Sequence, residues 1–267
     1  VNITGVTLGG ADADNYIVTN ALGSTKADIS KAVITAVSGI TAADKIYDGT
    51  TNATLATSGA ALTGVVSTDN LTVASAIGLF ADKNAGVNKA VSVTDISLGG
   101  SDAGNYSLAN PVFATSASIS ARPMSNWIGS VGNWSSAANW DVMPEGANVL
   151  GVAIPVGAAV TYDAAAGDTS LQTLSSSGSL AIVGGTLGVS GALTTPQYVQ
   201  TGGALIGTGA LSVNGSFNQS AGSILLGGPV NIVQSAGNLG VANVAASSIS
   251  LSAPGGAITQ TGALVTT

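Results

Sequence analysis

The side chains best suited to chemistry in this sequence are a few carboxylates and three tryptophans, because histidine and cysteine are absent. Their absence excludes a Ser-His-Asp triad, a Cys-His pair, a Cys/His zinc site and a disulfide framework. The closest carboxylates in the second half are Asp141 and Glu145. Two carboxylates can hydrolyse a glycosidic bond, but residues 123–267 contain no Lys, Arg or His to bind an acidic sugar. We therefore predict no catalytic residues and a protein that is not an enzyme.

A second group of oxygen ligands lies in the first half, where Asp12 is close to Asp14, and Asp102 is close to Asn105. Calcium takes six to eight oxygen ligands, whereas only two or three acids occur at any one place in this sequence. Asp and Asn are also frequent turn residues, because their side chains bond to nearby backbone. We predict ordinary turns here, with no metal site and no cofactor.

The three tryptophans, Trp127, Trp134 and Trp140, fall within fourteen residues, and each follows an asparagine. Buried together, they could plug the open end of a stacked β structure, which would otherwise expose apolar interior and unpaired strand edges. Exposed, they could stack on sugar rings, but only Asp141 and Glu145 are near to bind the sugar hydroxyls. The sequence favours the plug and leaves a glycan-binding site at these residues as the alternative.

Charge is scarce and unevenly distributed along the chain. The chain has six cationic and thirteen anionic side chains, which gives a net charge of −7. All six cations lie in the first 122 residues. The last 99 residues, after Asp168, carry no charged side chain. Nucleic acid and anionic membranes need basic protein surfaces, and no run of about 20 apolar residues could span a bilayer. We expect neither a nucleic-acid partner nor membrane insertion.

An internal repeat organises the first half of the chain. Residues 1–30 align with residues 91–120 at a constant offset of 90, without a gap, and fourteen of the thirty positions are identical. This pattern predicts tandem modules of about 90 residues, with residues 1–30 as the end of one module in a longer protein and the next copy complete.

Strand signals dominate the complete copy. Residues 91–98 alternate apolar and polar side chains, as a strand with one solvated face does. The segment 102–106 predicts a tight corner in which Tyr106 packs its ring inward and directs its hydroxyl to nearby backbone, as in immunoglobulin-like sandwiches. We expect a small β-sandwich-like module. A β-grasp-like fold, which would contain a helix, stays open as the alternative.

Three separated motifs in this copy resemble one known family: residues 44–51 (DKIYDGTT), 80–86 (FADKNAG) and 98–106 (LGGSDAGNY). Together they are similar to the YDG/MBG modules, which occur in tandem in giant secreted bacterial proteins of the filamentous-haemagglutinin type. The resemblance covers residues 1 to about 121. It implies a stalk or spacer in an extracellular adhesin and no catalytic residues. The tryptophan segment resembles, more loosely, the entry sequences of β-solenoids in such proteins.

From about residue 149 the sequence becomes short β-rich phrases separated by Gly, Asn and Ser. One phrase recurs around Gln200, Gln219, Gln234 and Gln260, at spacings of 19, 15 and 26. A period near 20 predicts a solenoid whose turns stack, here a parallel β-helix. Stacked turns place equivalent residues close together, so like charges would repel, whereas Ser, Thr, Asn and Gln can form ladders. The phrases are also similar to the shafts of filamentous-haemagglutinin-like exoproteins.

These observations predict an all-β chain with four parts: the C-terminal part of a module at 1–30, a complete module at 31–121, a Trp-rich junction or cap at 122–148 and a parallel β-helix-like solenoid at 149–267. We expect a structural segment of a secreted adhesin or extracellular fibre at the bacterial cell surface, with roles in cell adhesion and biofilm. Its expected partners are neighbouring modules, other copies of itself, and surface glycans or matrix polysaccharide.

Overall fold

The structure, a computed structural model, describes residues 1–20 and 22–267. It is all-β, with 55% of residues in strands and 5% in helical turns, which confirms the predicted fold class. Within the described residues no helix is long and apolar enough to cross a membrane. The chain divides into two compact units, made of residues 1–40, 57–76 and 94–113, and of residues 41–56, 77–93 and 114–267.

The first unit contains three short strand pairs. These pairs are β1 (Asn2–Ile3) with β2 (Gly23–Ser24), β4 (Ala36–Ser38) with β9 (Ala61–Thr63), both antiparallel, and β3 (Ala32–Ile34) with β12 (Tyr106–Leu108), which is parallel. Tyr106 is 4% exposed, and its hydroxyl donates to Asp69 Oδ2 at 2.6 Å and accepts from Val66 N at 3.0 Å. The inward-facing tyrosine corner is therefore confirmed, with a carboxylate as an additional partner.

A five-stranded sheet runs through the complete module. Its order is β6 (Lys45–Ile46), β13 (Phe113–Ser120), β11 (Gly86–Gly99), β10 (Thr72–Phe80) and β7 (Asn52–Ala53). A further antiparallel pair joins β5 (Thr41–Ala42) to β8 (Leu55–Ala56). The only helical segment in residues 31–120, all of them described, is the short 3-10 turn η2 (Ala103–Asn105). The complete module is therefore all-β and lacks the helix of a β-grasp fold.

The alternation predicted for residues 91–98 is interrupted within β11. Val91 and Val93 are buried on one face, but the next buried residue is Ile96, three positions on. Asp95 lies between them with a φ of +51°, in the left-handed region that non-glycine residues adopt rarely. This local kink shifts the side-chain period by one and returns Ile96 to the core.

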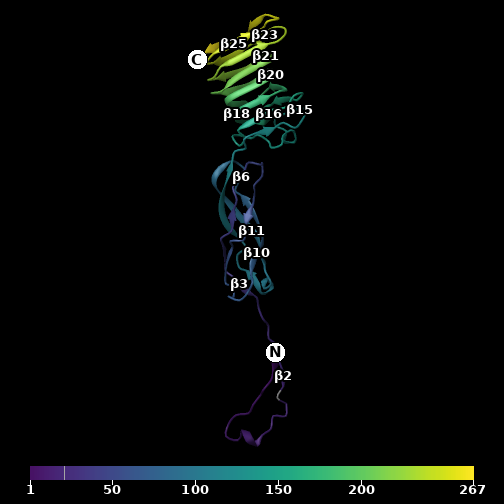
Figure 1. Cartoon of the computed structure of the whole chain (residues 1–267), viewed down its shortest axis with the longest axis vertical. Helices are drawn as coiled ribbons and strands as arrows, with labels where there is room; N and C mark the ends of the chain where they lie inside the picture. Colours follow the sequence, from purple (N-terminus) through teal and green to yellow (C-terminus); the bar gives the residue numbers. More distant parts are fainter. Residues whose placement is uncertain (21) are drawn as a thin grey trace. The chain divides into compact units, whose positions relative to one another are not determined.

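The second unit contains a parallel β-solenoid of about six turns, visible as the stacked strands β18, β20, β21 and β23 in Figure 1. Each turn has three strand segments, since β21 (Ala210–Leu226) pairs successively with β22 (Val230–Gln234), β23 (Leu239–Val241) and β24 (Asn243–Ala246). The last three strands pair on to β25 (Ile249–Ser252), β26 (Ile258–Gln260) and β27 (Leu264–Thr266). The preceding turns contain β16 (Gly151–Ile154), β17 (Ala159–Tyr162), β18 (Asp168–Ser176), β19 (Ser179–Ile182) and β20 (Thr186–Gly207).

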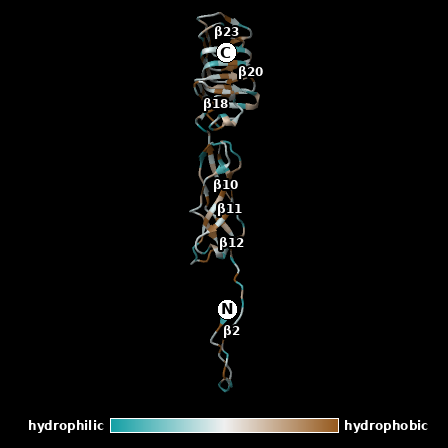
Figure 2. Ribbon diagram, turned by 90° about the vertical axis from the view of Figure 1, so that its right-hand side faces the viewer, coloured by the Kyte–Doolittle hydropathy of each residue, from teal (hydrophilic) through white to brown (hydrophobic). Residues whose placement is uncertain are grey.

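Apolar residues form columns inside the solenoid, so they recur from strand to strand of the stack (Figure 2). One column consists of successive parallel partners: Val152, Leu174, Leu193, Leu211 and Val230. All of these residues are at most 1% exposed. In a second column the rings of Tyr198 and Phe217 stack at 5.3 Å, with an angle of 8° between their planes. Burial of such columns is the main favourable contribution to the solenoid's stability.

Three of the four glutamines of the repeated phrase occupy two different kinds of position, and the fourth, Gln260, pairs with Val241. Gln200 and Gln219 are parallel partners, and Gln219 Nε2 donates to Gln200 Oε1 at 3.3 Å. Gln234 lies on another strand, where it pairs with Gly215, and its Oε1 accepts from Phe217 N at 2.7 Å. All three side chains are buried. The predicted ladder is thus limited to one pair, and Gln234 bonds to backbone at a corner.

Glycines let the corners of neighbouring turns approach closely. At Gly222, where φ is +80°, a Cβ would lie 2.5 Å from Gly202 O and 2.7 Å from Gln200 Nε2. At Gly237 φ is +72°, but no described atom lies within 4 Å of the Cβ position. The two glycines therefore share a backbone conformation and differ in their surroundings.

We predict that Gly222→Ala destabilises the solenoid more than Gly237→Ala does. The left-handed backbone costs either alanine about 1 kcal/mol, and the overlap at residue 222 adds roughly 1–3 kcal/mol. Urea unfolding of the full chain, followed by far-UV circular dichroism, measures both variants. Equal losses would show that the corners are not closely packed.

Candidate functional site

The tryptophan segment forms the first rungs of the solenoid. Strand β14 (Ser125–Asn126) pairs in parallel with β16, and β15 (Val131–Asn133) pairs in parallel with β17. Trp127 and Trp134 directly follow these two strands, and Trp140 follows the 3-10 turn η3 (Ala137–Asn139). The backbone therefore directs the three indoles to the same end of the solenoid interior.

The glycine and asparagine spacing of this segment has a packing reason. A Cβ on Gly129 would lie 2.8 Å from Asn139 Oδ1, and one on Gly132 would lie 2.5 Å from Asn139 Nδ2. The Asn139 amide also donates to Asn133 O at 3.2 Å. The two glycines thus make room for the asparagine that precedes Trp140.

The three indoles pack against one another edge to face. Ring centroids are 5.0 Å apart for Trp127 and Trp140, and 4.6 Å apart for Trp134 and Trp140. Trp134 also contacts Tyr162 at 5.2 Å, and Trp140 Nε1 donates to Trp134 O at 2.8 Å. Exposed fractions of the indole residues are only 2%, 0% and 4%. Sugar stacking needs an accessible ring face, and none of the three presents one to solvent.

Asp141 holds the outer side of this segment together. Its Oδ1 accepts hydrogen bonds from Ser125 Oγ at 2.9 Å, Asn126 N at 2.8 Å and Val142 N at 2.7 Å. Its Oδ2 accepts from Asn126 Nδ2 at 2.8 Å and Arg122 Nη2 at 3.1 Å. Partial burial acts to raise the pKa of Asp141, but the hydrogen bonds outweigh burial and hold the pKa well below its usual range.

A second cluster joins the tip of the complete module to the loop after the tryptophans, within the second unit. Lys83 Nζ and Glu145 Oε2 are 2.5 Å apart. Tyr47, from the YDG sequence, is fully buried beside them, and burial, followed by the charge of Glu145, raises its pKa. One buried apolar cluster includes Tyr47, the tryptophans and the solenoid core. The tip is therefore packed as well as ion-paired.

Asn148 is a buried polar residue of this second cluster. It is 7% exposed, its Oδ1 accepts from Ala85 N at 2.8 Å, and its Nδ2 donates to Asn84 Oδ1 at 2.9 Å. Two of the three motifs that suggested the YDG resemblance thus meet residues 145–148. Sequence reasoning missed these contacts, because they join residues more than 60 positions apart and carry no local signal.

Three of the acids considered for chemistry have structural partners. Asp141 and Glu145 make the bonds described above, and Asp102 Oδ2 accepts from Asn70 N at 2.8 Å and Ser101 Oγ at 2.9 Å. In the described part of the chain no group of three or more His, Cys, Asp or Glu side chains could hold a metal ion. These carboxylates tie turns and loops together.

Comparison with known proteins identifies one region. Residues 30–114, about a third of the 267-residue chain, match the family model of the YDG domain. No curated protein and no solved structure matches the chain. The protein therefore contains a YDG domain.

We predict that Asp141→Asn weakens the cap most at neutral pH. Because the folded-state pKa is depressed, the carboxylate stabilises the fold above the unfolded pKa of about 3.9, and this contribution is lost as the pH falls below that value. Urea unfolding followed by tryptophan fluorescence should show a wild-type advantage at pH 7 that shrinks between pH 4 and pH 2. Asp28→Asn controls for the loss of one charge, and a pH-independent advantage would contradict the prediction.

We also predict that the hydrogen bonds of the Asn148 amide contribute more to the stability of the contact between module tip and loop than the ion pair of Lys83 and Glu145 does. Asn148→Ala removes the buried amide and both of its hydrogen bonds, to the half-buried Ala85 N and the exposed Asn84 side chain. At about 0.5–1.5 kcal/mol for each hydrogen bond, it should cost about 1–3 kcal/mol. Glu145→Gln removes an ion pair with side chains 39% and 41% exposed, which should cost less than about 1 kcal/mol. Hydrogen exchange at residues 82–86 measures both effects. A larger loss in Glu145→Gln would reverse this ranking.

Proposed function

We propose that this protein is a structural segment of a large secreted bacterial adhesin or extracellular fibre of the filamentous-haemagglutinin type, in which it acts as a stalk and spacer. The observation that carries this proposal is the order of parts: a YDG domain, a buried tryptophan cluster and a stacked solenoid. Each part supplies mechanical continuity rather than a reactive site.

The tryptophan cluster acts, in this proposal, as the plug of the solenoid. An uncovered end would expose apolar interior and strand edges that recruit other chains. Rings at 4.6–5.2 Å, with the residues at most 4% exposed, support this role. The same burial argues against the alternative, a carbohydrate-binding module centred on Trp127, Trp134 and Trp140.

The proposal assigns no catalytic activity and no cofactor to the chain. Asp141, Glu145 and Asp102 are engaged in hydrogen bonds or an ion pair, and residues 123–267 hold no cation. General acid–base catalysis needs a titratable group free to reach a substrate. We infer that the partners are neighbouring modules, further copies of the chain and, at the cell surface, matrix polysaccharide.

A glycan array with wild type, Trp127→Ala and a surface control, Thr208→Ala, tests the proposal at the cluster. We expect no glycan to depend on Trp127, and we expect Trp127→Ala to lose about 3–5 kcal/mol of stability, as buried Trp→Ala changes do. Sugar binding that disappears in a folded Trp127→Ala protein would instead support the lectin alternative.

Cellular location is tested separately. An antibody raised against residues 149–267 should label intact, unpermeabilised cells of the source bacterium, in flow cytometry of cells that express the natural gene. Labelling that appears only after permeabilisation would contradict a surface role.

A further inference from the structure

Residues 1–20 and 22–30 reproduce the corner of the complete module. The 3-10 turn η1 (Ala13–Asn15) lies 90 positions before η2, and the φ values of Gly10 and Gly100 are +109° and +98°. In addition, β1 pairs with β2 at positions equivalent to neighbouring parts of β11 and β13. The segment thus has the local conformation of a finished module.

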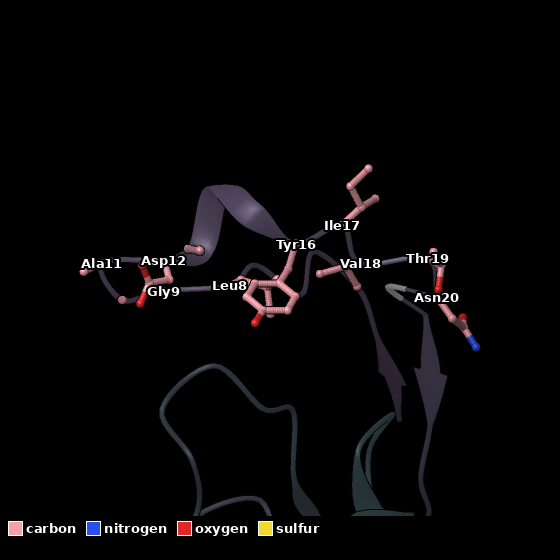
Figure 3. Close-up of a pocket in the computed structure, with 11 residues that line it drawn as sticks. Leu8, Gly9, Ala11, Asp12, Tyr16, Ile17, Val18, Thr19 and Asn20 are labelled. Atoms are coloured by element: carbon pink, nitrogen blue, oxygen red, sulfur yellow. The ribbon is translucent and has the colours of Figure 1, made fainter.

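Its surroundings differ from those of the complete copy. Tyr106 is 4% exposed, whereas the equivalent Tyr16 is 69% exposed. Tyr16 borders an open concavity of about 650 Å³ that Leu8, Gly9 and Asp12 also line (Figure 3). Residues 1–30 therefore present a surface that the complete module buries.

The complete copy shows what covers that surface. Asn70 N donates to Asp102 Oδ2 at 2.8 Å, and Asp102 N donates to Asn70 O at 3.3 Å. The Tyr106 hydroxyl bonds to the Asp69 carboxylate and to Val66 N. A single segment, residues 66–74, supplies these groups.

The glycines give an independent indication. At Gly99 a Cβ would lie 2.9 Å from Ala74 Cβ, so the complete copy has no room for a side chain there. At the equivalent Gly9 no described atom lies within 4 Å, and the backbone is not left-handed. Nothing in the present surroundings of Gly9 calls for glycine, but a neighbour like Ala74 would.

We propose that the concavity of residues 1–30 binds a β segment with the chemistry of residues 66–74. This occupant supplies a carboxylate and a backbone N–H to the Tyr16 hydroxyl, and a backbone N–H to the Asp12 carboxylate. It also brings a small side chain against Gly9 and covers Leu8 and Tyr16. The inference rests on the two copies of the corner and is independent of the role proposed above.

The test places a second copy of residues 31–90 directly ahead of Val1 in the full chain. Hydrogen exchange of residues 8–20 should then slow at least tenfold and approach that of residues 98–110. Asp69→Ala in the added copy should reverse most of this protection. Unchanged exchange at residues 8–20 would overturn the proposal, whether or not the added copy itself becomes protected.

Gly9→Val separates docking from a general effect of a longer chain. In the natural chain the new side chain enters open space, so exchange at residues 8–20 should stay the same. In the extended chain it meets the equivalent of Ala74 and should abolish the added protection. Equal protection of the extended chain with and without the Gly9→Val substitution would show that the segment does not dock in this way, and would also overturn the proposal.

Discussion

The rest of this structure depends on the parallel pairing of each solenoid turn with the next. Backbone hydrogen bonds fix neighbouring strands at about 4.8 Å, so each inward side chain meets its equivalent above and below. Columns such as Val152 to Val230 satisfy this constraint by apolar contact, and Gln200 with Gln219 satisfies it by a hydrogen bond. A charged residue in such a column would face a like charge or lack a partner. This constraint accounts for the absence of charge at the inward positions after Asp168.

A stack has ends, and the junction shows how one end is finished. Tryptophans fill the interior where the columns begin. On the outer side, the Asp141 carboxylate accepts hydrogen bonds from backbone N–H groups of the first rung. Asp141 and Glu145 lie here, where repetition stops and each acid can have individual partners. The module tip then packs on the loop at residues 145–148. The transition from module to solenoid is therefore a packed interface as well as a covalent connection.

Much of the fold could be predicted because repetition is visible in sequence. The offset of 90 residues predicted the modules, and the period near 20 and the missing charges predicted the solenoid. The clustered tryptophans predicted a buried aromatic group. Local exceptions were missed. The adjacent polar residues Thr94 and Asp95 already break the alternation in the sequence, and the left-handed backbone at Asp95 is the structural form of that break. The side chain of Gln234 bonds to backbone at a corner, although its phrase resembles those of Gln200 and Gln219, and nothing in the phrase distinguishes it. The contacts of Asn148 were also hidden, because they join distant loops through single amides.

The shortage of cations has a consequence for digestion. Trypsin-like enzymes cleave after Lys or Arg, and the last such residue, Arg122, is followed by proline, whose ring makes the bond a poor substrate. The next site toward the N-terminus is Lys89, within β11. The tryptophan cap and the solenoid therefore offer these enzymes almost no cleavage site even when the chain is unfolded. The composition that permits stacking thus also removes the cleavage sites of a major class of peptidases from the solenoid.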